Sequence, residues 1–176
     1  MTIAMFTEQP TLPLATWSTC KRYRYTLRRT WSTGGRIVAW LLLNPSTADE
    51  TQDDPTIRRC ISFSKSWGFD GLIIVNAYAW RSADPAGLRS LECAAAGGPV
   101  GAGNDAAITT AVTESALTVC GWGGNLNLGD GRRARLAHLL AGADLTALRV
   151  NSDGSPGHPL YLRGSLQPLP FSLEAP

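Results

Sequence analysis

Short apolar runs that end at polar residues recur along the chain. The first run covers residues 37–43 and stops at Asn44, which is followed by Pro45. Runs of about four to eight apolar residues are typical of strands that are buried on both faces of a sheet. Further strands of this kind are predicted over residues 72–75, 116–120 and 145–150. The Asn-Pro pair either only ends its strand or carries a functional amide to the edge of the sheet.

Helical patterns separate these runs. Asp54 and Pro55 provide an N-cap and a proline at the first helical position, and apolar residues then recur at helical spacing as far as Gly68. Further helices are predicted over residues 132–141 and around 86–95, the latter within a long connection from 83 to 104. Strands that alternate with helices form a mostly parallel sheet covered on both faces. The predicted fold is therefore α/β, with three αβα layers around a mostly parallel four-stranded sheet.

The segment before the first buried run is basic. Residues 20–31 alternate basic with aromatic or apolar residues, as in a half-buried strand, and the turn signal 32–35 follows. Residues 22–43 are therefore predicted to form a hairpin, with Asn44 at its far end. The basic face of the first strand either protects a solvated edge or holds nucleic-acid phosphates. The candidate phosphate ligands are Arg22, Arg24, Arg58 and Arg81.

Composition places the chain among ordinary globular proteins. It has 176 residues, of which 44% are hydrophobic and 17% are charged. We expect one domain over 1–176, with a core at about 20–162 and extended or weakly ordered termini. No apolar run approaches the roughly 20 residues that span a bilayer, and residues 1–13 lack the pattern of a signal peptide. A cytoplasmic monomer is expected, without a membrane partner.

Three polar residues are predicted to meet at one edge of the sheet. Asn44 and Asn76 follow buried strands, and His158 follows the last strand and its polar loop, 151–157. The carboxyl ends of parallel strands lie at the same edge, where open α/β folds build their sites. Two amides and an imidazole can orient a water molecule, read the edge of a flat heterocycle and stabilise a leaving anion. They do not easily supply a strong base.

The acidic segment 49–54 lies just beyond Asn44. Its carboxylates either join the site and bind a divalent cation, or form a solvated loop with a helix cap. The chain has no phosphate-binding loop of the Walker type, no nucleophile elbow, no HExxH pair and no dinucleotide fingerprint. Its four cysteines are widely spaced, without a CxxC pair, and are expected to be buried free thiols. We therefore expect no cofactor and no resident metal.

Four segments, in order, resemble motifs of the uracil-DNA glycosylase superfamily. They are Trp40-Leu41-Leu42-Leu43-Asn44-Pro45-Ser46, Gly71-Leu72-Ile73-Ile74-Val75-Asn76-Ala77, Val119-Cys120-Gly121-Trp122-Gly123 and Gly157-His158-Pro159-Leu160. A closer resemblance joins LNPSTAD, DDPTIRRC, GLIIVNAYAWRS, NDAAI and HPLYL to a small bacterial and phage family catalogued as a domain of unknown function. This closer resemblance covers roughly residues 20–162.

The superfamily resemblance implies a DNA glycosylase-like hydrolase that takes part in DNA repair. Such an enzyme flips a uracil-like, damaged or modified base out of DNA and cleaves its N-glycosidic bond. By position, Asn44 would orient the attacking water beside Pro45 and Ser46, and Asn76 would read the base. His158 would stabilise the departing base, and Leu160 would be a wedge in the vacated stack or a core residue.

The chain departs from the superfamily at the residue that stacks on the base. Thr56 and Ile57 stand where members usually carry an aromatic residue, so Phe63, Trp67 and Tyr78 are the candidates to replace it. Two alternatives remain open. One is a binding module for nucleic acid or modified bases that has no catalytic turnover. The other is an enzyme on free nucleosides or nucleotides, for which Asp49, Asp53 and Asp54 are the candidate ligands of an assisting metal.

Overall fold

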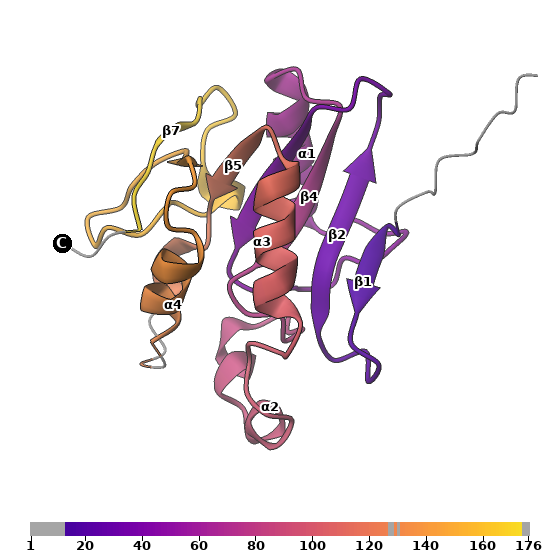
Figure 1. Cartoon of the computed structure of the whole chain (residues 1–176), viewed down its shortest axis with the longest axis vertical. Helices are drawn as coiled ribbons and strands as arrows, with labels where there is room; N and C mark the ends of the chain where they lie inside the picture. Colours follow the sequence, from indigo (N-terminus) through magenta and orange to yellow (C-terminus); the bar gives the residue numbers. More distant parts are fainter. Residues whose placement is uncertain (1–12, 127–128, 130, 174–176) are drawn as a thin grey trace, which may run out of the picture.

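The computed structural model describes residues 13–126, 129 and 131–173. In this part of the chain, a seven-stranded mixed sheet carries α-helices on both faces (Figure 1). The strands are β1 (Ala15–Trp17), β2 (Arg24–Thr30), β3 (Ile37–Leu42), β4 (Gly71–Asn76), β5 (Leu117–Cys120), β6 (Leu145–Ala147) and β7 (Leu169–Pro170). The helices are α1 (Pro55–Ser66), α2 (Leu91–Ala95), α3 (Asn104–Glu114) and α4 (Arg132–Leu139).

The strand order in the sheet is β1-β2-β4-β3-β5-β6-β7. The neighbouring strands β4, β3, β5 and β6 run parallel, while β1, β2 and β7 pair antiparallel with their neighbours. The predicted α/β class is confirmed. The sheet is larger and more mixed than the four-stranded sheet that the sequence predicts, because β2 and β1 extend it at one edge and β7 extends it at the other.

The predicted hairpin over residues 22–43 is wrong. β2 and β3 do not pair, because β4 lies between them and pairs antiparallel with β2 and parallel with β3. All six residues of β4 are buried, as in a central strand that is covered on both faces of the sheet. The turn that follows β2 therefore crosses over β4. Asn44 still follows the end of β3, which now lies at the centre of the sheet.

One face of the sheet packs on α1. The helix begins where the sequence predicts, with the Asp54 side chain accepting a hydrogen bond from the backbone N–H of Ile57 at 2.9 Å. The Trp40 indole, on β3, donates a hydrogen bond to the Ser64 hydroxyl at 3.0 Å and stacks on the ring of Trp67 at 5.6 Å. This aromatic contact holds α1 against the strand that leads to Asn44.

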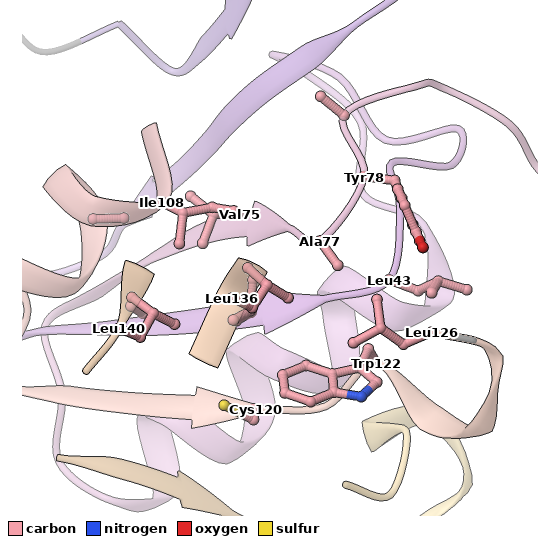
Figure 2. Packing of buried hydrophobic residues seen from close by; sticks show 14 of the residues in the cluster. Leu43, Val75, Ala77, Tyr78, Ile108, Cys120, Trp122, Leu126, Leu136 and Leu140 are labelled. Atoms are coloured by element: carbon pink, nitrogen blue, oxygen red, sulfur yellow. The ribbon is translucent and has the colours of Figure 1, made fainter. Parts of the chain in front are cut away.

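The other face packs on α3 and α4. Ile108 of α3 and Leu136 of α4 are fully buried there, and Figure 2 shows both in one apolar cluster with Trp122, which follows β5. Helix α3 was not predicted from the sequence. Most of its surface carries Ala and Thr, so it has no wide apolar stripe to mark it as a helix.

Three of the four cysteines, Cys60, Cys93 and Cys120, are buried free thiols, as predicted, whereas Cys20 is exposed. Burial raises the pKa of the Cys60 and Cys120 thiols, which are therefore poor nucleophiles. No helix among the described residues is both long and apolar enough to cross a membrane.

Candidate functional site

A cleft of about 470 Å³ opens where β3 and β5 end. The chain passes from β3 to β4 on one side and returns across β3 to reach β5 on the other, so the strand order reverses at this point. Ligands of open α/β sheets bind in the crevice at such a reversal. The polar side chains that line this cleft include Asn44, Ser46, Asp54, Arg149, Asn151 and His158.

The amide of Asn44 is held in one orientation. Its Nδ2 donates hydrogen bonds to the backbone oxygens of Pro45 at 2.9 Å and Ser82 at 2.8 Å. Two neighbouring carbonyls identify this atom as the nitrogen of the amide. Both amide hydrogens are thereby used, so Oδ1 is the atom that Asn44 presents to a ligand. This geometry makes Asn44 an acceptor that is positioned before a ligand arrives.

The imidazole of His158 is partly buried in the same cleft and caps the 3₁₀ helix Pro159–Tyr161. Its Nδ1 accepts a hydrogen bond from the backbone N–H of Leu160 at 3.4 Å. Burial lowers the pKa of His158, and the negative charge of Asp54 opposes part of this shift. The neutral ring with an acceptor at Nδ1 carries its proton at Nε2. His158 is therefore built to donate one hydrogen bond into the cleft.

For Asp54 the sequence left two roles open, a helix cap and a carboxylate of the site. It caps α1, as predicted, but it also lines the cleft, with a relative exposure of 8%. The capping bond uses Oδ1 alone. An acidic residue at a predicted helix cap was the available signal, but the sequence alone does not show that α1 begins beside Asn44.

The structure does not bring Asn76 into the cleft. Backbone pairing continues past β4, with Ala77 donating its N–H to the Leu42 oxygen, so Asn76 lies inside the sheet and is 1% exposed. The Asn104 side chain holds this segment from the other side through its Nδ2, which donates to the Asn76 backbone oxygen at 2.9 Å. Among the described residues, Nδ2 of Asn76 has no hydrogen-bond partner. The three predicted residues therefore do not all share one cleft.

The aromatic candidates for base stacking lie in the core. Phe63 is 1% exposed and its ring packs on those of Trp40 and Trp67, at 6.0 and 5.5 Å. Tyr78 is fully buried in the cluster on the opposite face (Figure 2). Neither ring lines the cleft, so neither is available to stack on a base there.

Other aromatic and apolar side chains line the cleft instead. Tyr161 is 81% exposed, with its ring 5.6 Å from that of His158, and Trp122 contributes part of the wall. Leu160 also lines the cleft, whereas Pro45 is buried and accepts a hydrogen bond from the Asn44 amide through its backbone oxygen. Tyr161 is therefore the ring best exposed to stack on a ligand.

Of the four arginines predicted to bind phosphates, one is buried and three are exposed in the structure. Arg24 is 2% exposed and donates from Nη1 to the Ala48 oxygen at 2.6 Å, so it is not a surface phosphate ligand. The other three candidates, Arg22, Arg58 and Arg81, are exposed. Arg58 donates to the backbone oxygen of Asp53, and Arg22 lies 4.0 Å from Glu92. Arg24 was misassigned because a bulge interrupts the pairing of β1 and β2, which breaks the simple alternation of faces.

Arg81 holds the loop that contains Ser46. Its Nε donates to the Ser46 oxygen at 2.9 Å and its Nη2 donates to the Thr47 oxygen at 3.1 Å. Removal of both bonds in Arg81→Ala costs about 1 kcal/mol in local stability at this exposed position. We expect hydrogen exchange of the backbone amides of residues 46–48 to accelerate by about fivefold, measured by mass spectrometry. Arg22→Ala is the control and should leave this exchange unchanged; equal acceleration in both variants would contradict the assignment.

The carboxylates of the acidic segment 49–54 contact different partners and do not converge on one point. Oδ1 of Asp49 accepts hydrogen bonds from the N–H groups of Thr51 and Gln52, and Asp53 pairs with Arg29 at 2.8 Å. Among residues 13–126, 129 and 131–173, no group of three or more His, Cys, Asp or Glu side chains could hold a metal ion. The metal-assisted alternative therefore has no cluster of ligands in this part of the chain.

Fold and cleft define an α/β protein whose candidate site combines an amide, an imidazole and a carboxylate at the carboxyl ends of parallel strands. The model of the family described as Protein of unknown function (DUF1643) matches residues 24–160. The chain belongs to this family. No curated protein matches the chain. No solved structure matches it.

Proposed function

We propose that this protein is a DNA glycosylase-like hydrolase that cleaves the N-glycosidic bond of a flipped uracil-like, damaged or modified base. The observation that carries the proposal is the pairing of Asn44 and His158 in one cleft. The fixed Oδ1 of Asn44 is suited to orient a water molecule, and the Nε2–H of His158 is suited to stabilise negative charge on a departing base. The two residues offer the acceptor and the donor that this hydrolysis requires.

The size and lining of the cleft fit one flipped nucleotide. A volume of about 470 Å³ lies within the range of about 300–1,000 Å³ that is usual for small-molecule sites. Tyr161, which is 81% exposed, provides aromatic surface against a flat base. The four parallel strands β4, β3, β5 and β6, with helices on both faces, support a relation to the uracil-DNA glycosylase fold. This relation is part of the proposal.

A second, shallower depression would hold the nucleic-acid backbone. It has a volume of about 390 Å³ and is lined by Lys21, Arg22 and Arg81, among others. It adjoins the cleft, because Ser82 lines the depression and Ala83 lines the cleft. Basic side chains bind phosphates independently of sequence, so the depression would position a strand while the cleft takes the base. We propose DNA as the partner.

Asn76 stays in the proposal as a second donor to the base. A buried amide with an unpaired Nδ2 is uncommon, because the lost hydrogen bond costs free energy. A carbonyl oxygen of a base would satisfy it. Since Asn76 is 1% exposed, this contact requires the segment after β4 to move when the nucleotide enters.

A panel of oligonucleotides that carry uracil, hypoxanthine, modified pyrimidines or alkylated bases tests the function. We expect at least one of them to lose its base, leaving an abasic site that alkali converts to a strand break. Free nucleosides with the same bases form the second arm, and release from these alone would assign the enzyme to small substrates. Tight binding without product would establish a binding module, and neither binding nor release would overturn the proposal.

A further inference from the structure

The cleft needs a base that its two predicted residues do not supply. Asn44 presents an amide oxygen, which orients a water molecule but has no useful affinity for its proton. The basic nitrogen of His158, Nδ1, already accepts the N–H of Leu160. Hydrolysis releases one proton for each water that attacks, and a positioned carboxylate is one of the groups that enzymes use to accept it.

Asp54 is a carboxylate in the right place. It lines the cleft together with Asn44 and His158, and its backbone lies at the start of α1, which Trp40 anchors to the strand before Asn44. Its Oδ1 is fixed by the N–H of Ile57. Hydrogen bonds among the described residues leave its second oxygen free. The side chain is thus held by one oxygen and can react through the other.

The negative charge of Asp54 acts on two neighbouring groups, the Arg24 guanidinium and the His158 imidazole. Burial lowers the pKa of Arg24 to about 10, and Asp54 opposes this shift, as it does for the pKa of His158. Asp54 therefore lies within electrostatic reach of a buried guanidinium and of the imidazole. Arg24, at 2% exposure, supplies the positive charge that balances a carboxylate withdrawn from water.

We propose that Asp54 is the general base of the cleft, an inference that rests on the proposed glycosylase function. A water molecule that is held by Oδ1 of Asn44 attacks C1′ of the flipped nucleotide. The C1′–O bond forms, and the C1′–N bond breaks with its electron pair passing to the base. The water proton passes to the second oxygen of Asp54, while Nε2–H of His158 hydrogen-bonds to the anionic base. The departed base anion takes up a proton from solvent and Asp54 gives up the proton that it accepted, so the products are an abasic sugar and the free base.

Asp54→Asn tests this role without removing the helix cap, because Asn and Asp are equally good N-caps. We expect kcat for base release to fall by about 100-fold, the lower part of the range for general bases, with KM changed less than threefold. Asp53→Asn is the matched control, since Asp53 pairs with Arg29 and does not line the cleft. Its kcat should stay within threefold of wild type. A similar result for Asp54→Asn would overturn the inference.

A double variant separates catalysis from folding. Asp54→Asn removes the negative charge that acts on Arg24, whereas Arg24→Met combined with Asp54→Asn replaces both buried charges by neutral groups. We expect the double variant to regain thermal stability but not base release. Recovery of wild-type kcat would show that Asp54 has only a structural role, and would overturn the inference.

An NMR titration of His158 gives a readout that does not depend on activity. Removal of the negative charge should lower the pKa of His158 further in Asp54→Asn and leave it unchanged in Asp53→Asn. An unchanged pKa in Asp54→Asn would contradict the placement of Asp54 beside the imidazole. If wild type releases no base from any substrate, the proposed function fails and the general-base role fails with it. If wild type is active and Asp54→Asn remains as active, the inference alone fails.

Discussion

Replacement of Asn44 by alanine is expected to lower kcat for base release by about 10³-fold, because a misplaced water loses most of its advantage over bulk solvent. DNA affinity should change less than threefold, since the proposed phosphate contacts lie in the separate depression lined by Arg22 and Arg81. The measurement is single-turnover base release on the substrate that the oligonucleotide panel identifies, together with binding by fluorescence anisotropy. If Asn44→Ala lost DNA affinity to the same extent as kcat, the role of Asn44 would not be confined to orienting the reacting water.

Asn44→Asp distinguishes orientation of the water from removal of its proton. A carboxylate at this position would face the Pro45 and Ser82 oxygens, which accept hydrogen bonds from the amide in the wild type. The lost bonds and the repulsion should destabilise the protein by about 2 kcal/mol, measured by chemical denaturation. We expect kcat for base release in Asn44→Asp to be no higher than in wild type. A faster variant would show that a base at residue 44 is what the site lacks, and would argue against Asp54.

His158→Ala carries the second large expected effect, a fall in kcat of about 10³-fold, the upper range for loss of one donor to a developing anion. The loss should be largest for bases that leave poorly and smaller for bases that are stable anions. His138→Ala is the matched control, because His138 is exposed on α4 and does not line the cleft. Equal losses for all leaving bases would indicate that His158 has only a structural role.

The pH dependence follows from the direction of the His158 shift. Burial places the pKa of His158 in the folded protein below its ordinary value near 6.5. The unfolded chain therefore binds a proton more readily, so this residue makes the protein less stable as the pH falls from about 6.5 through the folded-state pKa. The neutral ring predominates at pH 7 and above. Chemical denaturation over this pH window should show the free energy of unfolding falling more steeply with decreasing pH in wild type than in His158→Ala. Equal pH dependence in the two proteins would show that another group is responsible.

The local patterns predicted much of the fold. Asp54 and Pro55 mark the start of α1 because capping and a proline at the first turn are interactions between near neighbours in sequence. The apolar runs that became β3, β4 and β5 were visible because strands buried on both faces require apolar side chains. The partner of β2 could not be predicted in this way. Pairing depends on which strand fills the space beside it, and β4 is 40 residues or more from β2 in sequence.

Burial decided which candidates belong to the site. Arg24 and Phe63 are plausible ligands on the basis of residue type, yet both are enclosed by the protein, Arg24 under the loop of Ala48 and Phe63 between Trp40 and Trp67. Asn76 lies in the sheet because pairing with the chain after β3 continues beyond its strand. The sequence by itself determined the strand ends that carry Asn44 and the loop that carries His158, since both follow from local punctuation. Only the tertiary structure decided that Asp54 joins them and Asn76 does not, because the distance between side chains depends on how α1 and the strands pack.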